Sequence, residues 1–390
     1  MIQLSNRRAA ILIAVLAAAV YVNTLWNGFA FDDVHIIVEN ERVHGIDRVG
    51  EAFLSPYWPN SPARMALYRP LATAMYAVEW DLWNASPVGY HAVNVVLHAA
   101  VSVLVLLLLL RLRAPLGAAL AGSAVFAVHP VHVEAVANVV GRAELLAALF
   151  YLAAVLLYLR LAPCSWPRAL AIGVAYFLGL AAKEMAVTLP AALLLLELAR
   201  RRDSAGWGER VAREWRVVFT TTVALAAYVA LRWQVTGEAV GNDVEATLAS
   251  QTTGERMLTV LHLWPEYARL LFFPVDLVVD YSPGVLVLPS GFEATVIAGI
   301  LLGSSVAIGA VLAWRRAPMI TLGIAWFAVT IFPVSNLVVP VGILLAERTL
   351  YLPSVGLALG VAGLICARPL AEPARRRLVT TILVLIIPAA

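Results

Sequence analysis

Long apolar runs separated by short polar segments dominate the chain. The first run covers residues 9–25, and many of the later runs approach the length that a helix needs to cross a bilayer. Runs of this length and composition are not typical of the amphipathic helices of soluble proteins. We therefore expect an all-α, polytopic membrane protein with about 11 transmembrane helices. The predicted helices cover residues 9–25, 89–110, 115–128, 143–160, 168–182, 186–199, 216–233, 292–314, 318–332, 354–367 and a last one that begins near 378.

Two long, more polar stretches interrupt this pattern. The first covers residues 26–88 and is rich in aromatic residues from Tyr57 to Trp83. Aromatic side chains are typical of membrane interfaces, so we expect interfacial helices there that lie flat on the bilayer. The second covers residues 234–290 and includes an amphipathic segment. We find no internal repeat and expect residues 1–390 to form a single domain.

Composition supports a membrane protein and excludes other classes. The chain is 62% hydrophobic and 14% charged, whereas a soluble domain is about half apolar and a quarter charged. The arginines form short clusters between apolar runs, as membrane anchors do, so no nucleic-acid partner is expected. Cys164 and Cys366 are expected to be free thiols. The first run lacks a clear cleavage site, which favours an uncleaved helix.

The distribution of charge predicts the orientation. With the N-terminus in the cytoplasm, most of the 28 Lys and Arg residues fall inside and most of the 25 Asp and Glu residues fall outside. The unusual polar residues then share the outer, periplasmic or lumenal, face, which favours a functional site there. They are Asp32, Asp33, Arg69, His91, His129, His132, Glu134, Arg142, Glu144, Lys183, Glu184, Glu347 and Arg348.

Asp32 and Asp33 follow the first helix directly. Two adjacent acids should repel each other, so one of them could have a raised pKa and suit proton abstraction. The alternative is an ordinary solvated loop.

The other polar residues also have two interpretations each. Arg142 with Glu144, and Lys183 with Glu184, could be site residues or could only order helix ends. His129, His132 and Glu134 could bind a divalent metal, but Pro130 breaks the helix between the histidines, which favours hydrogen-bonded histidines without a metal. Glu347 and Arg348 lie in a segment rich in proline, residues 333–353, which favours a re-entrant loop that holds Arg348 against an anion.

Several blocks of the chain form a recognisable series from about residue 20 to 360. They are Phe31-Asp32-Asp33 with Asn40, Tyr68-Arg69-Pro70-Leu71, Tyr90-His91-Ala92-Val93-Asn94, residues 126–136, Gly141-Arg142-Ala143-Glu144-Leu145-Leu146, Lys183-Glu184 and residues 346–354. In matching order, these blocks resemble the transmembrane and tetratricopeptide-repeat O-mannosyltransferases of the GT-C superfamily, which are related to the protein O-mannosyltransferases. That family usually carries tetratricopeptide repeats after the membrane region, and none is found in this chain.

The resemblance implies a GT-C-type bundle that transfers a sugar, most simply mannose, from a polyprenyl-phosphate donor to a hydroxyl with inversion. The acceptor would be a protein Ser or Thr on the non-cytoplasmic side, and no cofactor or metal is implied. Asp32 would be the general base, and Asp33 would orient the acceptor or share that role. Two of Arg142, Lys183 and Arg348 would bind the donor phosphate. The sugar or acceptor side would be lined by His91, His129, His132, Glu134, Glu144, Glu184 and Glu347.

Two alternatives stay open at this point. A GT-C transferase could act on a lipid or glycan acceptor instead of a protein. A transporter or lipid-sugar flippase is the main alternative from another class, but transporters place ionisable residues near the midplane of paired repeats. Here the polar residues gather at one face, which favours an enzyme.

Overall fold

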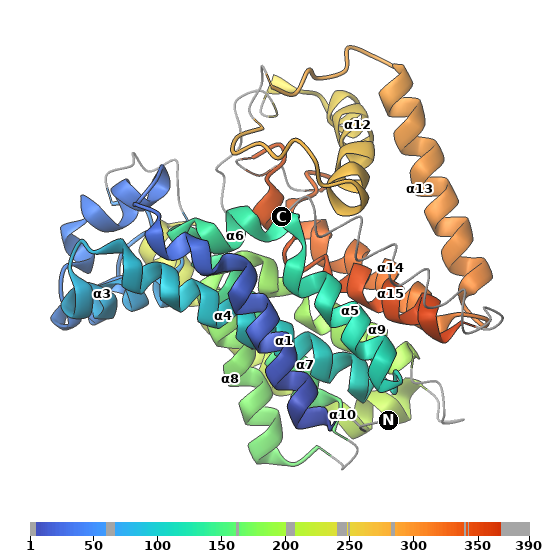
Figure 1. The fold of residues 1–390 in the computed structure, drawn as a ribbon, viewed down its shortest axis with the longest axis horizontal. Coiled ribbons are helices and arrows are strands. Elements are labelled where there is room, and N and C mark those ends of the chain that lie inside the picture. The colour runs from blue at the N-terminus through green and yellow to red at the C-terminus, as the bar shows by residue number, and fades with distance from the viewer. Residues whose placement is uncertain are drawn as a thin grey trace.

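A computed structural model describes residues 5–59, 67–160, 164–199, 207–239, 248, 250–281, 285–338, 341 and 343–367. These residues form helices joined by short turns (Figure 1). Most of the long helices lie side by side in one bundle. The bundle contains α1 (Asn6–Tyr21), α4 (Pro87–Arg111), α5 (Leu116–Val128), α7 (Arg142–Tyr158), α8 (Trp166–Ala182), α9 (Leu189–Ala199), α10 (Trp207–Thr236), α14 (Pro318–Ile331) and α15 (Val355–Cys366).

Large apolar and aromatic side chains fill the centre of this bundle. Tyr151 of α7 packs edge-to-face against Trp326 of α14, and both are almost fully buried. Glycine allows α14 and α15 to approach closely, because a Cβ atom on Gly323 would collide with the carbonyl oxygen of Gly356, and the reverse also holds. Contacts between small residues of this kind are a common way to pack helices in membranes.

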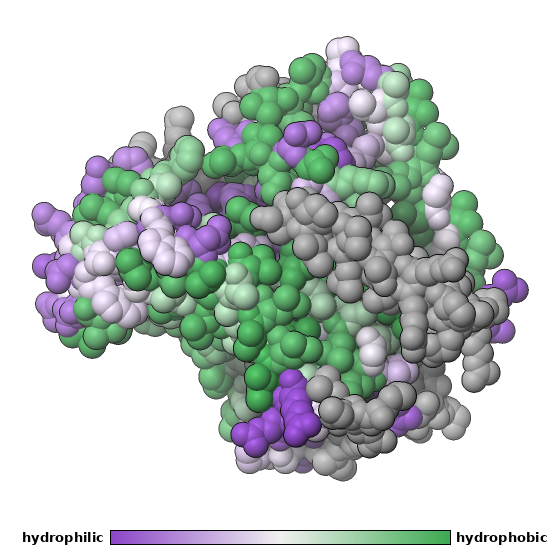
Figure 2. Space-filling model, in the orientation of Figure 1, coloured by the Kyte–Doolittle hydropathy of each residue, from purple (hydrophilic) through white to green (hydrophobic). Residues whose placement is uncertain are grey.

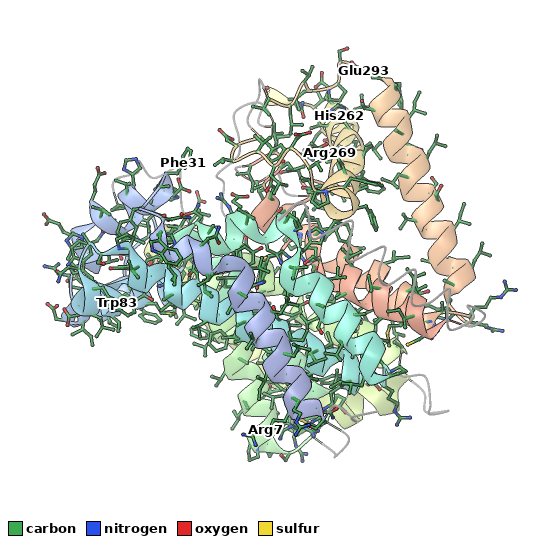
Figure 3. The ribbon with its side chains drawn as sticks, in the orientation of Figure 1. Arg7, Phe31, Trp83, His262, Arg269 and Glu293 are labelled. Carbon is green, nitrogen blue, oxygen red and sulfur yellow. The ribbon has the colours of Figure 1, made fainter. Side chains whose placement is uncertain are left out.

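Two parts of the chain extend from the bundle at the end away from Arg7 (Figure 3). The first is the segment between α1 and α4, which includes α2 (Val49–Ala52) and α3 (Pro70–Trp83). The second is the pair α12 (Thr253–Phe272) and α13 (Ala294–Ala313), which stands at the edge of the molecule. Short helical turns and α6 (Val133–Ala137) lie between these two parts.

The predicted apolar segments are helices wherever the structure describes them. Ten of the eleven predictions coincide with α1, α4, α5, α7, α8, α9, α10, α13, α14 and α15, and the helix expected from residue 378 lies outside the described residues. Within the described residues, five helices are long and apolar enough to cross a membrane, or six if the bent pair of α5 with the turn through α6 is one span. The all-α membrane class therefore fits, whereas a count of eleven crossings is not confirmed. Figure 2 shows the apolar surface over the bundle, with hydrophilic residues concentrated at its ends.

Several aromatic residues of the first polar stretch pack inside the protein. Tyr57, Tyr68 and Tyr76 are buried, and Tyr76 of α3 donates a hydrogen bond to the Val139 carbonyl. Tyr57 and Tyr76 belong to a second, smaller core, whereas Tyr68 belongs to the main core of the bundle. The interfacial placement of the stretch as a whole stays a prediction.

Candidate active site

Asp32 and Asp33 lie in a tight turn, residues Ala30 to Asp33, which we call the acidic turn. The Asp33 backbone N–H donates to the Ala30 carbonyl over 3.0 Å, and the Ala30 N–H donates to the Asp33 carboxylate over 3.2 Å. Phe31 and Asp32 are therefore the two central residues of the turn. Phe31 has a φ of +50°, a left-handed conformation that is unfavourable for a bulky residue.

The Asp33 carboxylate is held by the backbone that leads into α7. It accepts hydrogen bonds from the N–H groups of Val140 at 2.9 Å and Val139 at 3.4 Å. The side chain is almost completely buried, and this burial raises the pKa of Asp33 to about 6, against the opposing effect of the backbone donors. The charge of Asp32 makes only the smallest contribution to that rise, so burial, not repulsion between the acids, is the main cause.

Asp32 has a different environment from its neighbour. It is half-buried, and among the described residues no hydrogen bond to its carboxylate is found. Adjacent acids in one turn thus differ in exposure, which leaves Asp32 as the carboxylate that an incoming molecule can reach.

Next to the acidic turn lies a group of charged residues, which we call the charge cluster. Its members are Arg69, Glu134, Glu144, Lys183, Glu184, Arg232 and Arg348. They come from the start of α3, α6, α7, the turn after α8, the end of α10 and the turn before α15. Four cations face three carboxylates in this cluster, so it has a surplus positive charge.

Glu184 binds two arginines at once. Its carboxylate oxygens lie 3.4 Å from Nε of Arg69 and 3.2 Å from Nη1 of Arg232. The Arg69 guanidinium also lies 5.1 Å from the centre of the Tyr57 ring, and Tyr57 is close enough to Asp32 and Asp33 to interact with their charges. Tyr57 and Arg69 therefore connect the acidic turn to the charge cluster.

Two further ion pairs complete the cluster. Lys183 pairs with Glu144 in a buried contact. Arg348 pairs with Glu134 over 2.8 Å, and the Arg348 N–H donates to the same carboxylate. Lys183 interacts electrostatically with both Arg69 and Arg348, so the three cations belong to one site. The Arg348 side chain remains 26% exposed. Figure 2 shows hydrophilic atoms in a shaded hollow between the first polar stretch and the upper part of the molecule.

Arg142 lies apart from this arrangement. Its side chain is fully buried and pairs with Glu79 of α3, and its other nitrogens donate to the Asn94 side chain at 3.0 Å and the Tyr90 carbonyl at 2.8 Å. The guanidinium also lies over the Tyr76 ring. These contacts occupy the donors that a phosphate would need and join α3, α4 and α7.

The three predicted histidines are also buried. His129 bonds to the Leu271 carbonyl at 3.0 Å and His132 to the Ser354 hydroxyl at 2.8 Å, in a core shared with His98. His91, at the start of α4, is fully buried against the backbone of Asn27 and Gly28. The structure therefore places these rings behind the charge cluster rather than in it.

Glu347 bonds away from the cluster, although Arg348 is its neighbour. One of its oxygens accepts hydrogen bonds from the Val278 N–H and the Tyr281 hydroxyl, both at 2.8 Å. Glu347 thus fixes the segment after α12 to the turn that carries Arg348. Within the described residues, no group of three or more His, Cys, Asp or Glu side chains is arranged to hold a metal ion.

Some residues of the site had no role in the sequence-based prediction. Arg69 was singled out without a function, and Arg232 resembles an ordinary basic residue at a helix end. Glu79 could have been noticed as an acid between apolar residues of α3, which can indicate a buried ion pair.

Comparison with known proteins agrees with the motifs. The chain is 30% identical over 90% of its length to Protein O-mannosyl-transferase F38B6.6 of Caenorhabditis elegans, and covers 50% of that protein. It is 30% identical over 92% of its length to Protein O-mannosyl-transferase TMTC3 of Homo sapiens, and covers 42% of it. TMTC4 of Homo sapiens is 26% identical over 89% of this chain.

The chain thus spans about half the length of the curated relatives that it matches. No protein-family model matches it, and no solved structure matches it either. These relatives align over 90–92% of this chain. Over about 90% of its length the chain is therefore similar to protein O-mannosyl-transferases, the class of protein that its motifs resemble.

Proposed function

We propose that this protein is a membrane mannosyltransferase that glycosylates hydroxyl groups of proteins. The donor is a polyprenyl-phosphate mannose, and the reaction takes place on the non-cytoplasmic side. The observation that carries the proposal is the pairing of an accessible carboxylate, Asp32, with an adjacent cluster that has surplus positive charge. The names of the relatives, all protein O-mannosyl-transferases, support the sugar and the acceptor class.

The reaction requires a base and an anion-binding site that are close enough to act on the same bound sugar. An acceptor oxygen attacks C1 of the sugar, its proton passes to the Asp32 carboxylate, and the new C–O bond forms with inversion. The bond from C1 to the phosphate oxygen breaks, and its electron pair leaves with the lipid phosphate. Negative charge grows on the phosphate as the bond breaks, so fixed cations stabilise the transition state.

We assign the phosphate to Arg69, Lys183 and Arg348 and exclude Arg142 from direct contact. Arg69 and Arg348 are partly exposed and each shares a carboxylate in the resting structure. An arriving phosphate can take over one hydrogen-bonding edge of each guanidinium without leaving a buried carboxylate unpaired. Arg232 remains on Glu184, and the Arg348 backbone N–H remains on Glu134. Asp33 is a positioning residue in this scheme, since its oxygens hold the turn that presents Asp32.

The test uses the full chain in lipid vesicles with radiolabelled polyprenyl-phosphate mannose and Ser/Thr peptides. Transfer of label to peptide is expected for the native protein and is expected to fall at least 100-fold in Asp32→Asn, because the base is lost. Unchanged transfer by Asp32→Asn contradicts the base assignment. Label that appears only on a lipid or glycan, or that crosses the membrane without transfer, instead identifies one of the two alternative functions.

A further inference from the structure

Phe31 combines an unfavourable backbone with an exposed aromatic ring. Its φ of +50° is a conformation that glycine adopts freely and that costs a bulky residue free energy. The ring is 69% exposed, so contacts within the described chain bury little of it. Burial does not explain a phenylalanine at this position.

The acidic turn determines where the ring points. Two reciprocal hydrogen bonds between Ala30 and Asp33 close the turn, so Phe31 and Asp32 both project from its apex. Figure 3 shows Phe31 at the upper edge of the first polar stretch, on the opposite side from Trp83 and across from the part of the chain that carries Arg269. The exposed Phe31 therefore stands next to the carboxylate that is proposed to take the acceptor proton.

Contact with membrane lipid is a weaker explanation for the exposure of the Phe31 ring. Arg7 marks the opposite end of α1 in Figure 3, so Phe31 lies beyond the end of that apolar helix. Trp26 is 80% exposed and sits directly at the end of the α1 segment, where interfacial aromatic residues normally lie. Phe31, five residues later, lies in the acidic turn beside Asp32 instead.

We infer that Phe31 is a specificity-determining residue that binds an apolar side chain of the acceptor polypeptide next to the hydroxyl that receives the sugar. The inference rests on the proposed function, because it needs a protein acceptor at Asp32. Phe31 and Asp32 are adjacent residues of one turn, so a polypeptide that places a hydroxyl at Asp32 must place a neighbouring residue near the ring. An aromatic ring gains free energy by covering an aliphatic side chain there.

The experiment compares two synthetic acceptor peptides, one with Val-Thr-Val and one with Gly-Thr-Gly at its centre. The native protein in vesicles is expected to prefer the Val-flanked peptide about 3- to 10-fold in kcat/KM, the range that one aromatic contact provides. Phe31→Ala and Phe31→Gly are both expected to reduce this ratio to about one. Phe31→Tyr is expected to keep it. Donor KM is expected to stay unchanged in all three variants.

The ratio of the two peptides separates specificity from folding, because a damaged protein would use both peptides less well. Phe31→Gly also removes the backbone strain, so a loss of preference there assigns the effect to the ring. Leu54→Ala is the matched control, since Leu54 is equally exposed in the same stretch. A preference that survives in Phe31→Ala, or that Leu54→Ala abolishes equally, overturns the inference.

The outcome remains separable from that of the proposed function. If the native protein transfers no sugar to either peptide, the proposed function fails first. Phe31 replaced by a photo-crosslinking phenylalanine then tests binding alone. Preferential crosslinking to the Val-flanked peptide still supports the acceptor contact, and crosslinking only to lipid contradicts it.

Discussion

At the scale of single residues, two ion pairs of similar appearance have different consequences. Arg142 with Glu79 is buried, and the remaining contacts of the guanidinium go to Asn94 and Tyr90 inside the protein. Arg69 with Glu184 is partly exposed, and Glu184 has a second arginine. The first arrangement stabilises the fold, whereas the second leaves a cation that can bind a substrate anion.

Removal of Arg69 should therefore weaken donor binding without unfolding the protein. We expect Arg69→Ala to raise the KM for polyprenyl-phosphate mannose about tenfold or more, because a charge-assisted phosphate contact is lost. Arg48→Ala is the matched control, since Arg48 forms an exposed ion pair in the same stretch. An unchanged donor KM in Arg69→Ala would remove Arg69 from the phosphate site.

Removal of Arg142 should instead destabilise the protein. Arg142→Ala leaves the buried Glu79 carboxylate without its partner, which typically costs about 3–5 kcal/mol. The expected result is a large fall in Tm, measured in detergent, and Glu79→Gln in the same background should recover part of it. A variant that is as stable as the native protein but binds donor poorly would restore Arg142 to the phosphate site.

Asp33 predicts a pH dependence of both stability and activity. Its pKa rises from 3.8 to about 6 on folding, so between these values the folded protein binds a proton that the unfolded chain has released. This group's contribution to stability is therefore greatest below pH 3.8 and is lost as the pH rises through 6. Activity should change in the opposite direction, because only the ionised carboxylate accepts all three backbone bonds.

We accordingly expect kcat/KM to fall below pH 6 in the native protein. The fall should have an apparent pKa near 6. In Asp33→Asn, kcat/KM should be lower than in the native protein at neutral pH and should not fall further below pH 6. A profile of the native enzyme that stays flat from pH 7 to pH 5 would show that ionisation of Asp33 does not matter for transfer.

At the scale of elements, the turn between α6 and α7 is the critical piece of backbone. It provides the N–H groups of Val139 and Val140 for Asp33, and it begins the helix that carries Glu144. Gly141 permits the turn, because a Cβ atom there would collide with the carbonyl oxygens of Glu134 and Ala135.

Gly141→Ala should displace this turn and with it the acidic turn. We expect at least a tenfold loss of kcat with a smaller change in donor KM, because the base moves while the phosphate ligands on α3 and η9 (Glu347–Leu350) stay. Gly117→Ala in α5 is a suitable control, since a Cβ atom there meets nothing within 4 Å. Equal activity of the two variants would contradict this role of the turn.

The elements were also the part that the sequence predicted best. Apolar runs give helices regardless of their neighbours, so ten predicted segments were found as helices. The partners of charged residues could not be predicted in the same way, because Glu79 and Arg142 are 63 positions apart and meet only after α3 folds back. The same folding buries Tyr57 and Tyr76, although a stretch rich in aromatic residues is typical of a membrane interface.

At the scale of the whole molecule, the charged residues that matter gather at one end of the bundle. The motifs of Asp32, Lys183 and Arg348 fall on one predicted face of the membrane, so these residues were expected to lie together. In the structure they lie in one region, where Tyr57 and Arg69 connect them. The pattern of charge could predict where these residues lie. The participation of Arg232 and the partner of each charged residue could be identified only from the packed bundle.

This arrangement predicts which residues a reagent can reach from each side. In a background without Cys164 and Cys366, we expect Glu51→Cys to react with a membrane-impermeant maleimide in sealed right-side-out vesicles, because Glu51 is exposed beside the proposed outer site. Arg7→Cys, at the other end of α1, should react only after permeabilisation. Labelling of Arg7→Cys in intact vesicles would reverse the proposed orientation.

The hydrogen bonds of Asp33 also have a consequence for the timing of synthesis. The donors of Val139 and Val140 lie 106 and 107 positions after the acid that they hold. A growing chain therefore displays Asp33 as an ordinary solvated carboxyl, with an ordinary pKa, until α7 has been made and inserted. Nascent or truncated chains that stop before Val139 lack both donors, and their acidic turn is closed only by the two bonds between Ala30 and Asp33. Full attachment of the acidic turn to the bundle is thus a late event in synthesis of the chain.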